Sequence, residues 1–284
     1  MTTHTIAVLS DSHGNGTAMR AVLADAEKFN VDEIWSLGDI AFGGPSSEDC
    51  YQLLSEVNTT QYLKGNWESA YNMFTDTKKI NLDDPTQVYY AMLVAYDYDR
   101  FGPERDKQLH ELPMTGRKEM DGLTISLTHN LPNINRGHTL FPVEAQENFD
   151  AITPDEDVDI AIYAHTHTPL WRYTSSEQMV LNPGSVGQSW FTRQKFLADR
   201  DASYLLLTLA DGKVMDVHFR RVLFSWETEI QIAKDRHFPY VSVYQHLLET
   251  GNASTHNAEV LGKINDAHNY RQTVIDFLKE LEEK

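Results

Sequence analysis

The stretch TIAVLSDSHGN, residues 5–15, begins as an apolar run and ends as a polar turn. Its residues 6–9 are all apolar, which is the pattern of a strand buried on both faces. Asp11 and His13 follow that strand, two residues apart. Ligands bind at the carboxyl ends of strands in open α/β sheets, so this carboxylate and this imidazole mark a candidate site.

The segments that follow repeat an alternation of strands and helices. Residues 19–29 carry apolar side chains at helical spacing, and 33–37 form a short strand pattern. A helix pattern over 47–57 and another strand pattern at 61–63 come next. Such units imply parallel pairing, so we expect an α/β fold whose sheet is covered by helices.

Residues 69–120 break the alternation. The segment is long and aromatic, with a helical pattern around 85–101, and we interpret it as a helical excursion near the site. Short strand patterns then return, and Asp211 and Gly212 form a hairpin signal between the last two. They predict a mixed sheet or two packed sheets, with strands at 123–127, 159–163, 179–181, 204–209 and 214–222.

The end of the chain has helical patterns, around residues 227–234 and over 258–284. We therefore divide the chain into a main domain, residues 1–224, and a helical C-terminal extension, residues 225–284.

Composition limits the classes of partner. The 284 residues hold 42 acidic and 24 basic side chains, a formal net charge of −18, which disfavours nucleic acid and anionic membranes as partners. The single cysteine, Cys50, fits a reducing compartment. We see no leader-like or membrane-spanning apolar run, so we expect a cytoplasmic protein. The oligomeric state stays open.

Side chains suited to metal binding follow five of the predicted strands. Each short motif alone is typical of an ordinary turn, but five of them in one consistent arrangement indicate a metal site. They comprise two carboxylates, one carboxamide and four imidazoles: Asp11, His13, Asp39, Asn66, His129, His165 and His167.

This donor set predicts two divalent cations. Mixed oxygen and nitrogen ligands favour manganese or iron, with zinc and cobalt as alternatives, and seven ligands are too many for one ion. Two ions that share a carboxylate would use them all. Such a pair, about 3.5–4 Å apart, holds a phosphoryl group and activates a water.

The blocks SDSHGN, LGDI, KGNWE, THN, AHTHTP and NPGSVGQ resemble, in this order, those of the calcineurin-like metallophosphoesterases, from about residue 5 to about residue 221. The resemblance is to the bacterial phosphodiesterase branch. NPGSVGQSWF and HFRRVLFSWETEIQIAKD further resemble streptococcal-type phosphodiesterases that cleave diadenosine tetraphosphate asymmetrically. The implied fold is a four-layer α/β sandwich of two mixed sheets packed face to face, with helices outside.

The resemblance also implies roles for individual residues. Asn66 and His129 would act as catalytic residues that orient phosphate oxygens. The implied reaction is hydrolysis of phosphodiesters or nucleoside polyphosphates, including diadenosine tetraphosphate to ATP and AMP, by a hydroxide that bridges the metals. The metal ligands would be Asp11, His13 and His167 on the first ion, Asn66, His129 and His165 on the second, and Asp39 between them.

Trp67 departs from this family pattern, because many relatives have a histidine there that serves as leaving-group acid. Without that acid, substrates with acidic leaving groups should react best. We also interpret Trp67, Arg193 and Arg200 as candidate contacts to a small-molecule substrate.

Two other function classes stay open. A non-catalytic scaffold would keep the fold as a protein-binding surface, although a decayed site should have lost several of the ligands. A phosphoprotein phosphatase would suffer most from the missing acid, because alkyl leaving groups are poor.

Overall fold

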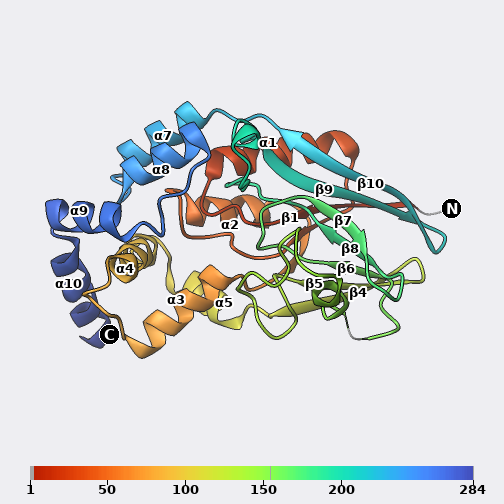
Figure 1. The fold of residues 1–284 in the computed structure, drawn as a ribbon, viewed down its shortest axis with the longest axis horizontal. Coiled ribbons are helices and arrows are strands. Elements are labelled where there is room, and N and C mark those ends of the chain that lie inside the picture. Colours follow the sequence, from red (N-terminus) through yellow and green to blue (C-terminus); the bar gives the residue numbers. More distant parts are fainter. Residues whose placement is uncertain (1–2, 154, 284) are drawn as a thin grey trace.

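Two five-stranded mixed sheets pack face to face in the computed structural model, which describes residues 3–153 and 155–283. Helices cover the outside of the sheets and gather at one end of the molecule (Figure 1). This arrangement confirms the predicted α/β fold with its C-terminal helices.

The first sheet has the strand order β10-β9-β1-β2-β3. Its strands β1, β2 and β3 are parallel, and β9 and β10 add antiparallel strands beside β1. Asp211 and Gly212 both have positive φ and join β9 to β10, as their sequence predicts. The strands are β1 (Thr3–Leu9), β2 (Glu33–Ser36), β3 (Thr59–Tyr62), β9 (Ala202–Ala210) and β10 (Lys213–Val222).

The second sheet has the order β4-β5-β6-β8-β7, with β5, β6 and β8 parallel and both edges antiparallel. The edge strands β4 and β7 were not predicted, and β4 lies inside the segment interpreted as helical. β4 exposes Thr115, Arg117 and Glu119, and β7 has four residues, of which Trp171 and Tyr173 are exposed, so neither shows the apolar run of a central strand. The strands are β4 (Thr115–Met120), β5 (Leu123–Thr128), β6 (Ile160–Ile162), β7 (Leu170–Tyr173) and β8 (Met179–Asn182).

The side chains of β1 alternate between two cores. Ile6 and Val8 point into the core between the two sheets, which also contains Trp35. Ala7 and Leu9 belong to the core on the outer face, under the helices. Because both faces are covered, the strand is apolar at successive positions, and this pattern predicted it from the sequence.

The helices form an outer layer and a helical end. α1 and α2 follow β1 and β2, whereas α3, α4, α5, α9 and α10 lie together at the end where the chain terminates (Figure 1). None of the helices described is long and apolar enough to cross a membrane. The bounds are α1 (Gly16–Ala26), α2 (Ser47–Ser55), α3 (Asn66–Thr77), α4 (Pro85–Tyr98), α5 (Pro103–Glu111), α6 (Gln146–Asp150), α7 (Trp226–Asp235), α8 (Val241–Thr250), α9 (Ala258–His268) and α10 (Tyr270–Glu283).

The last two helices pack on the 69–120 segment of the same chain. The side-chain amide of Asn265 donates to the carbonyl of Pro85 at 3.2 Å, and the ring of Phe277 stacks on Phe74 with centroids 6.1 Å apart. The single helix predicted over 258–284 is interrupted at Asn269, whose φ of 55° ends α9 in the left-handed conformation. α8 was not predicted.

Asp97 of α4 should make stability depend on pH. Its carboxylate is buried, accepts a hydrogen bond from Ser47 Oγ at 2.6 Å, and has its pKa raised to about 7 by burial. An unfolded aspartate titrates near roughly 3.9, so the folded chain holds an extra proton between about pH 4 and 7. The free energy of unfolding should therefore fall by about 1.4 kcal/mol per pH unit as pH rises through this window.

Asp97→Asn should remove that contribution when denaturant unfolding of metal-free protein is compared with wild type across this window. Asp99→Asn, at the exposed end of the same helix, is the matched control and should keep the wild-type slope. An unchanged slope in Asp97→Asn would show that this carboxyl does not hold the proton.

Candidate metal centre

The carboxyl ends of strands from both sheets meet at one edge and bring the predicted ligands together. The loops after β1, β2, β5 and β6 carry all but one of them, and Asn66 begins α3 directly after the loop that leaves β3. Two groups have ligand atoms within 4.8 Å of one another: Asp11, His13 and His167, and Asp39, His129 and His165.

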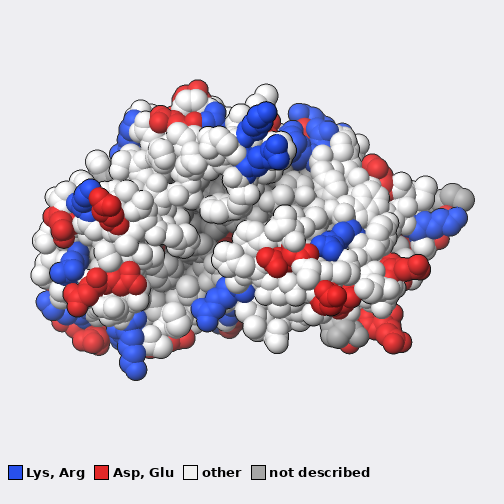
Figure 2. Space-filling view, in the orientation of Figure 1, with Lys and Arg blue, Asp and Glu red and all other residues white. Residues whose placement is uncertain are grey.

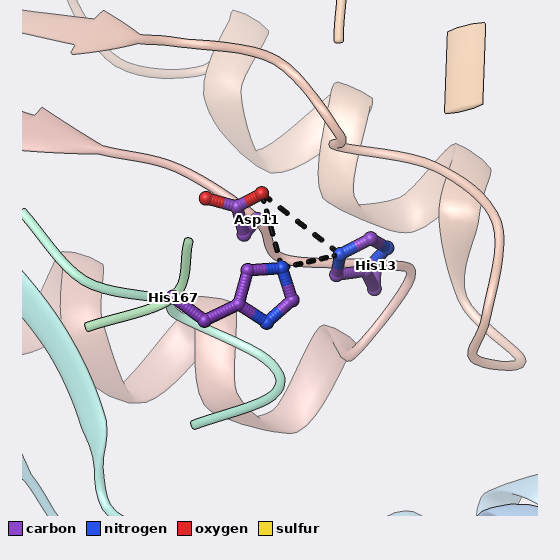
Figure 3. A group of neighbouring side chains, drawn as sticks. All are labelled: Asp11, His13 and His167. Carbon is purple, nitrogen blue, oxygen red and sulfur yellow. Dashed lines mark hydrogen bonds and ion pairs between the residues drawn. The ribbon is translucent and has the colours of Figure 1, made fainter. Parts of the chain in front are cut away.

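Asp11, His13 and His167 converge in the first cluster (Figure 3). Oδ1 of Asp11 lies 3.3 Å from Nε2 of His167 and 3.9 Å from Nε2 of His13. Asp11 is fully buried, and its Oδ1 has no hydrogen-bond partner among the described residues. Because a buried carboxylate oxygen without a donor is costly, this atom fits the coordination of a cation.

Asp39, His129 and His165 form the second cluster, and Asn66 adjoins it. Oδ2 of Asp39 lies 3.4 Å from Nε2 of His129, which is 3.2 Å from Oδ1 of Asn66. The same Asp39 oxygen is 3.8 Å from Nε2 of His13. One oxygen of Asp39 therefore lies between imidazoles of both clusters.

Backbone carbonyls orient the imidazoles. In His13, His129 and His167, Nδ1 faces a backbone carbonyl, and a carbonyl can only accept a hydrogen bond. When such a ring is neutral, its proton is therefore on Nδ1, and Nε2 presents a lone pair. The Nε2 atoms of His13 and His167 are 3.2 Å apart, so their lone pairs face each other as in a shared coordination sphere. His165 is reversed, with Nε2 facing the carbonyl of Gly137 at 3.0 Å. The carbonyl partners are Phe42 for His13, Leu37 for His129 and Gln188 for His167.

Carboxylates and imidazoles shift one another's pKa in this buried site. Burial lowers the pKa of His129, but the charge of Asp39 outweighs it and raises the pKa to about 9. Burial and the charge of His129 lower the pKa of His165 to about 4. Burial alone would raise the pKa of Asp11, but the neighbouring charge on His167 outweighs this and holds the pKa of Asp11 well below its usual range. Metal binding should therefore displace protons, because ligating imidazoles must be neutral.

The turns that carry these ligands are strained. Asp11, His13, Asp39, His165 and His167 all have positive φ, between 47° and 65°. Residues other than glycine adopt this region rarely, and such conformations cluster at functional sites because the surroundings must maintain them.

Glu68 is a buried carboxylate that our sequence analysis missed. Its two oxygens accept hydrogen bonds from the backbone N–H groups of Asp39, Ile40, Ala41 and Gly65. Burial and the charge of Asp39 raise its pKa to about 7. Its place three residues after Gly65, the capping-box spacing, was the local signal for it. Glu68 thus ties the loop after β2 to the start of α3.

Gly65 allows two loops to approach closely at this point. A Cβ at Gly65 would lie 2.0 Å from Oδ1 of Asp39, and the backbone N–H of Trp67 donates to that same oxygen at 2.9 Å. Any larger residue would therefore displace the Asp39 side chain.

A cavity of about 700 Å³ extends from the clusters toward the helical end, and Figure 2 shows the surface hollowed between this end and the sheets. Trp67 lines the cavity. Arg193 and Arg200 are not among the described residues that line it. The guanidinium of Arg193 lies 5.8 Å from the ring centroid of Phe196, and Arg200 donates to the carbonyl of Glu249. Neither contact involves a residue that lines the cavity, and the interpretation of both arginines as substrate contacts stays a prediction.

Comparisons with known proteins agree with this architecture. The model of the calcineurin-like phosphoesterase superfamily domain matches residues 5–212. An uncharacterized protein from Methanocaldococcus jannaschii is 27% identical over 206 residues, which is 64% of this chain and 76% of the relative.

Solved structures show the same fold. A metallophosphoesterase from Sphaerobacter thermophilus is similar with a TM-score of 0.66 and 24% identity, over 88% of this chain and 100% of that one. A hypothetical protein from Pyrococcus horikoshii is similar with a TM-score of 0.70 and 18% identity, over 88% and 99% of the two chains.

Glu68→Gln should disrupt the site through the loop after β2. The amide N–H of glutamine would face backbone N–H donors, so we expect a loss of roughly 2–4 kcal/mol in unfolding free energy and reduced metal content by elemental analysis. Glu229→Gln is the matched control, because Glu229 is equally buried and accepts hydrogen bonds from Thr17 and Tyr244 in another part of the fold. It should lose stability but keep its metal. Full metal content in Glu68→Gln would contradict the positioning role.

Divalent cations should stabilise the folded chain. Mn²⁺ at about 100 times its dissociation constant should raise the unfolding free energy by about 2.7 kcal/mol per site, and chelation should reverse this. Asp11→Asn should weaken the effect and lower the metal stoichiometry, whereas Asp25→Asn, whose carboxylate binds Arg220, should not. Equal stabilisation of Asp11→Asn and wild type would rule out Asp11 as a ligand.

Proposed function

Because the chain belongs to the calcineurin-like phosphoesterase superfamily, whose domain matches residues 5–212, we propose that it is a phosphodiesterase that works with two divalent cations. The observation that carries this proposal is the pair of adjoining Asp/His clusters, with one oxygen of Asp39 between them. The mixed donors suit manganese or iron, with zinc and cobalt as alternatives.

The chain's own residues would prepare the site before substrate arrives. When bound, the cations supply Lewis acidity to phosphoryl oxygens and lower the pKa of an attacking water. The carbonyl of Leu37, 2.7 Å from Nδ1 of His129, holds that ring with Nε2 toward Asn66. Because the His129 ring is already oriented before substrate binds, it need not reorganise during the reaction. The cation ligands would be Asp11, His13 and His167 for one ion, and Asn66, His129 and His165 for the other, with Asp39 shared.

Trp67 affects which leaving groups the site can release. Its ring lies beside His13, with centroids 6.0 Å apart, where the family resemblance implies a leaving-group acid. An indole N–H donates a hydrogen bond but does not act as a proton source near pH 7. Substrates should therefore be those whose leaving group departs as an anion, such as aryl diesters. Nucleoside polyphosphates also qualify, and diadenosine tetraphosphate is the specific candidate.

The expected partner is a small molecule. The cavity of about 700 Å³ lies within the usual range of small-molecule sites, and the net charge of −18 disfavours nucleic acid. A phosphoprotein phosphatase or a non-catalytic scaffold would have no need of a hollow of this size beside the clusters.

Mn²⁺-loaded protein should hydrolyse bis(p-nitrophenyl) phosphate faster than p-nitrophenyl phosphate, and both faster than alkyl diesters. Asp39→Asn should reduce the rate by at least about 100-fold, since it removes the carboxylate between the clusters. Asp25→Asn, whose carboxylate binds Arg220 and does not line the cavity, is the control and should react at the wild-type rate. Released p-nitrophenolate is measured for the two aryl compounds, and the monoester and alcohol formed are measured for the alkyl diesters.

Diadenosine tetraphosphate is tested with the same samples, and its products are separated by chromatography. ATP plus AMP would support the asymmetric cleavage. A faster monoester reaction would favour the phosphatase, and no turnover of any compound by metal-loaded protein would favour the scaffold.

A further inference from the structure

Part of the cavity lining lies outside the matched family domain. One end is formed by cluster residues, including His13 and His165, and the other by α3, α4 and the segment between α8 and α9. Ala253, Thr255 and His256 of that segment line the cavity. The superfamily match ends at residue 212, so these three residues belong to the C-terminal extension, whereas α3 and α4 lie inside the match.

One wall of the cavity, which begins beside the clusters at Trp67, is aromatic. Trp67, Phe74 and Tyr90 line it, and we call these three residues the aromatic wall. Trp67 and Tyr90 have ring centroids 5.4 Å apart, and Tyr90 meets Phe74 edge-on at 6.4 Å. Phe42 supports Trp67 from behind as a nearly parallel ring at 6.4 Å. The wall is therefore a packed surface whose rings hold one another in place.

The hydroxyl of Tyr90 has no partner. It is buried, and no described residue forms a hydrogen bond with it. Burial raises the pKa of Tyr90 well above its usual value, so the hydroxyl keeps its proton and acts as a donor. An unsatisfied buried hydroxyl destabilises a folded protein, and phenylalanine at this position would avoid the penalty. A ligand that accepts this hydrogen bond would account for the tyrosine.

The lining of the cavity carries few charged side chains. Asp39 and Lys79 are the only Asp, Glu, Lys or Arg residues among the described residues that line it. Lys79 is exposed and has no ion-pair partner in the described part of the chain. Lys79 could therefore face a phosphate oxygen, whereas the rest of the lining away from Asp39 suits an uncharged group.

We propose that the aromatic wall binds a flat, uncharged group, such as a nucleobase or aryl ring, of a substrate whose scissile phosphate group lies at the Asp/His clusters. The group packs against Trp67, and the Tyr90 hydroxyl donates a hydrogen bond to an acceptor on it. The inference rests on the proposed function for the place of the phosphate, but the binding of the flat group can be measured without turnover.

The test compares two phosphate ligands by calorimetry on Mn²⁺-loaded protein. AMP carries a nucleobase and methyl phosphate does not, so AMP should bind more tightly to wild type. Tyr90→Phe should weaken AMP binding about 3- to 10-fold and Trp67→Leu about 10-fold or more. Neither variant should change the affinity for methyl phosphate by more than about twofold.

Tyr96→Phe is the matched control, because it removes a hydroxyl from the same helix that does donate, to the carbonyl of Pro45 at 3.1 Å. Tyr96→Phe should lower the melting temperature and leave AMP affinity unchanged. Tyr90→Phe should match or exceed the wild-type melting temperature while binding AMP more weakly. If Tyr90→Phe lowered the melting temperature without changing the affinity for AMP, Tyr90 would instead have a structural role.

The outcomes separate this proposal from the proposed function. Equal AMP affinity in wild type, Tyr90→Phe and Trp67→Leu would overturn the aromatic wall as a binding site, even if aryl diesters are hydrolysed. AMP bound no better than methyl phosphate would overturn it as well. Variant-sensitive AMP binding without any hydrolysis would support the wall and contradict the phosphodiesterase.

Discussion

The hydrogen bonds of one buried carboxylate, Glu68, are the constraint on which this site depends. Four backbone N–H groups point at its two oxygens, three from the loop after β2 and one from Gly65. Both segments leave strands of the first sheet and carry predicted ligands, Asp39 and Asn66. Because a buried carboxylate must be fully paired, the loops cannot separate without exposing its charge to an apolar interior.

Strain and orientation in the ligand turns follow from this arrangement. Five ligand residues keep left-handed backbones, and backbone carbonyls select the imidazole nitrogen that faces each cluster. Asp11 leaves one oxygen buried without a donor. Such features lower the stability of the folded chain. They can persist because the rest of the fold stabilises the chain by more than they cost, and because binding of a cation would offset that cost.

The helical end gives the site its cavity. α9 and α10 pack on α4 rather than extending from the fold, and this brings the segment around residues 253–256 to the cavity opposite the clusters. Its surface is mainly uncharged, although the chain as a whole is strongly acidic. The clusters therefore lie within the matched superfamily domain, and the C-terminal segment adds residues to the cavity beside them.

Local patterns in the sequence determined the central strands, the covering helices and the set of donor residues, because a strand buried on both faces must be apolar at every position. Parallel strands share one carboxyl edge, which is why residues as far apart as Asp11 and His167 could be expected to meet. Tertiary structure alone decided that Glu68 is an anchor and not an ordinary helix cap, that β4 completes a sheet edge, and that the Tyr90 hydroxyl lacks a partner. Each of these depends on which distant segment covers a polar group, and burial of that kind leaves no periodic trace in the sequence.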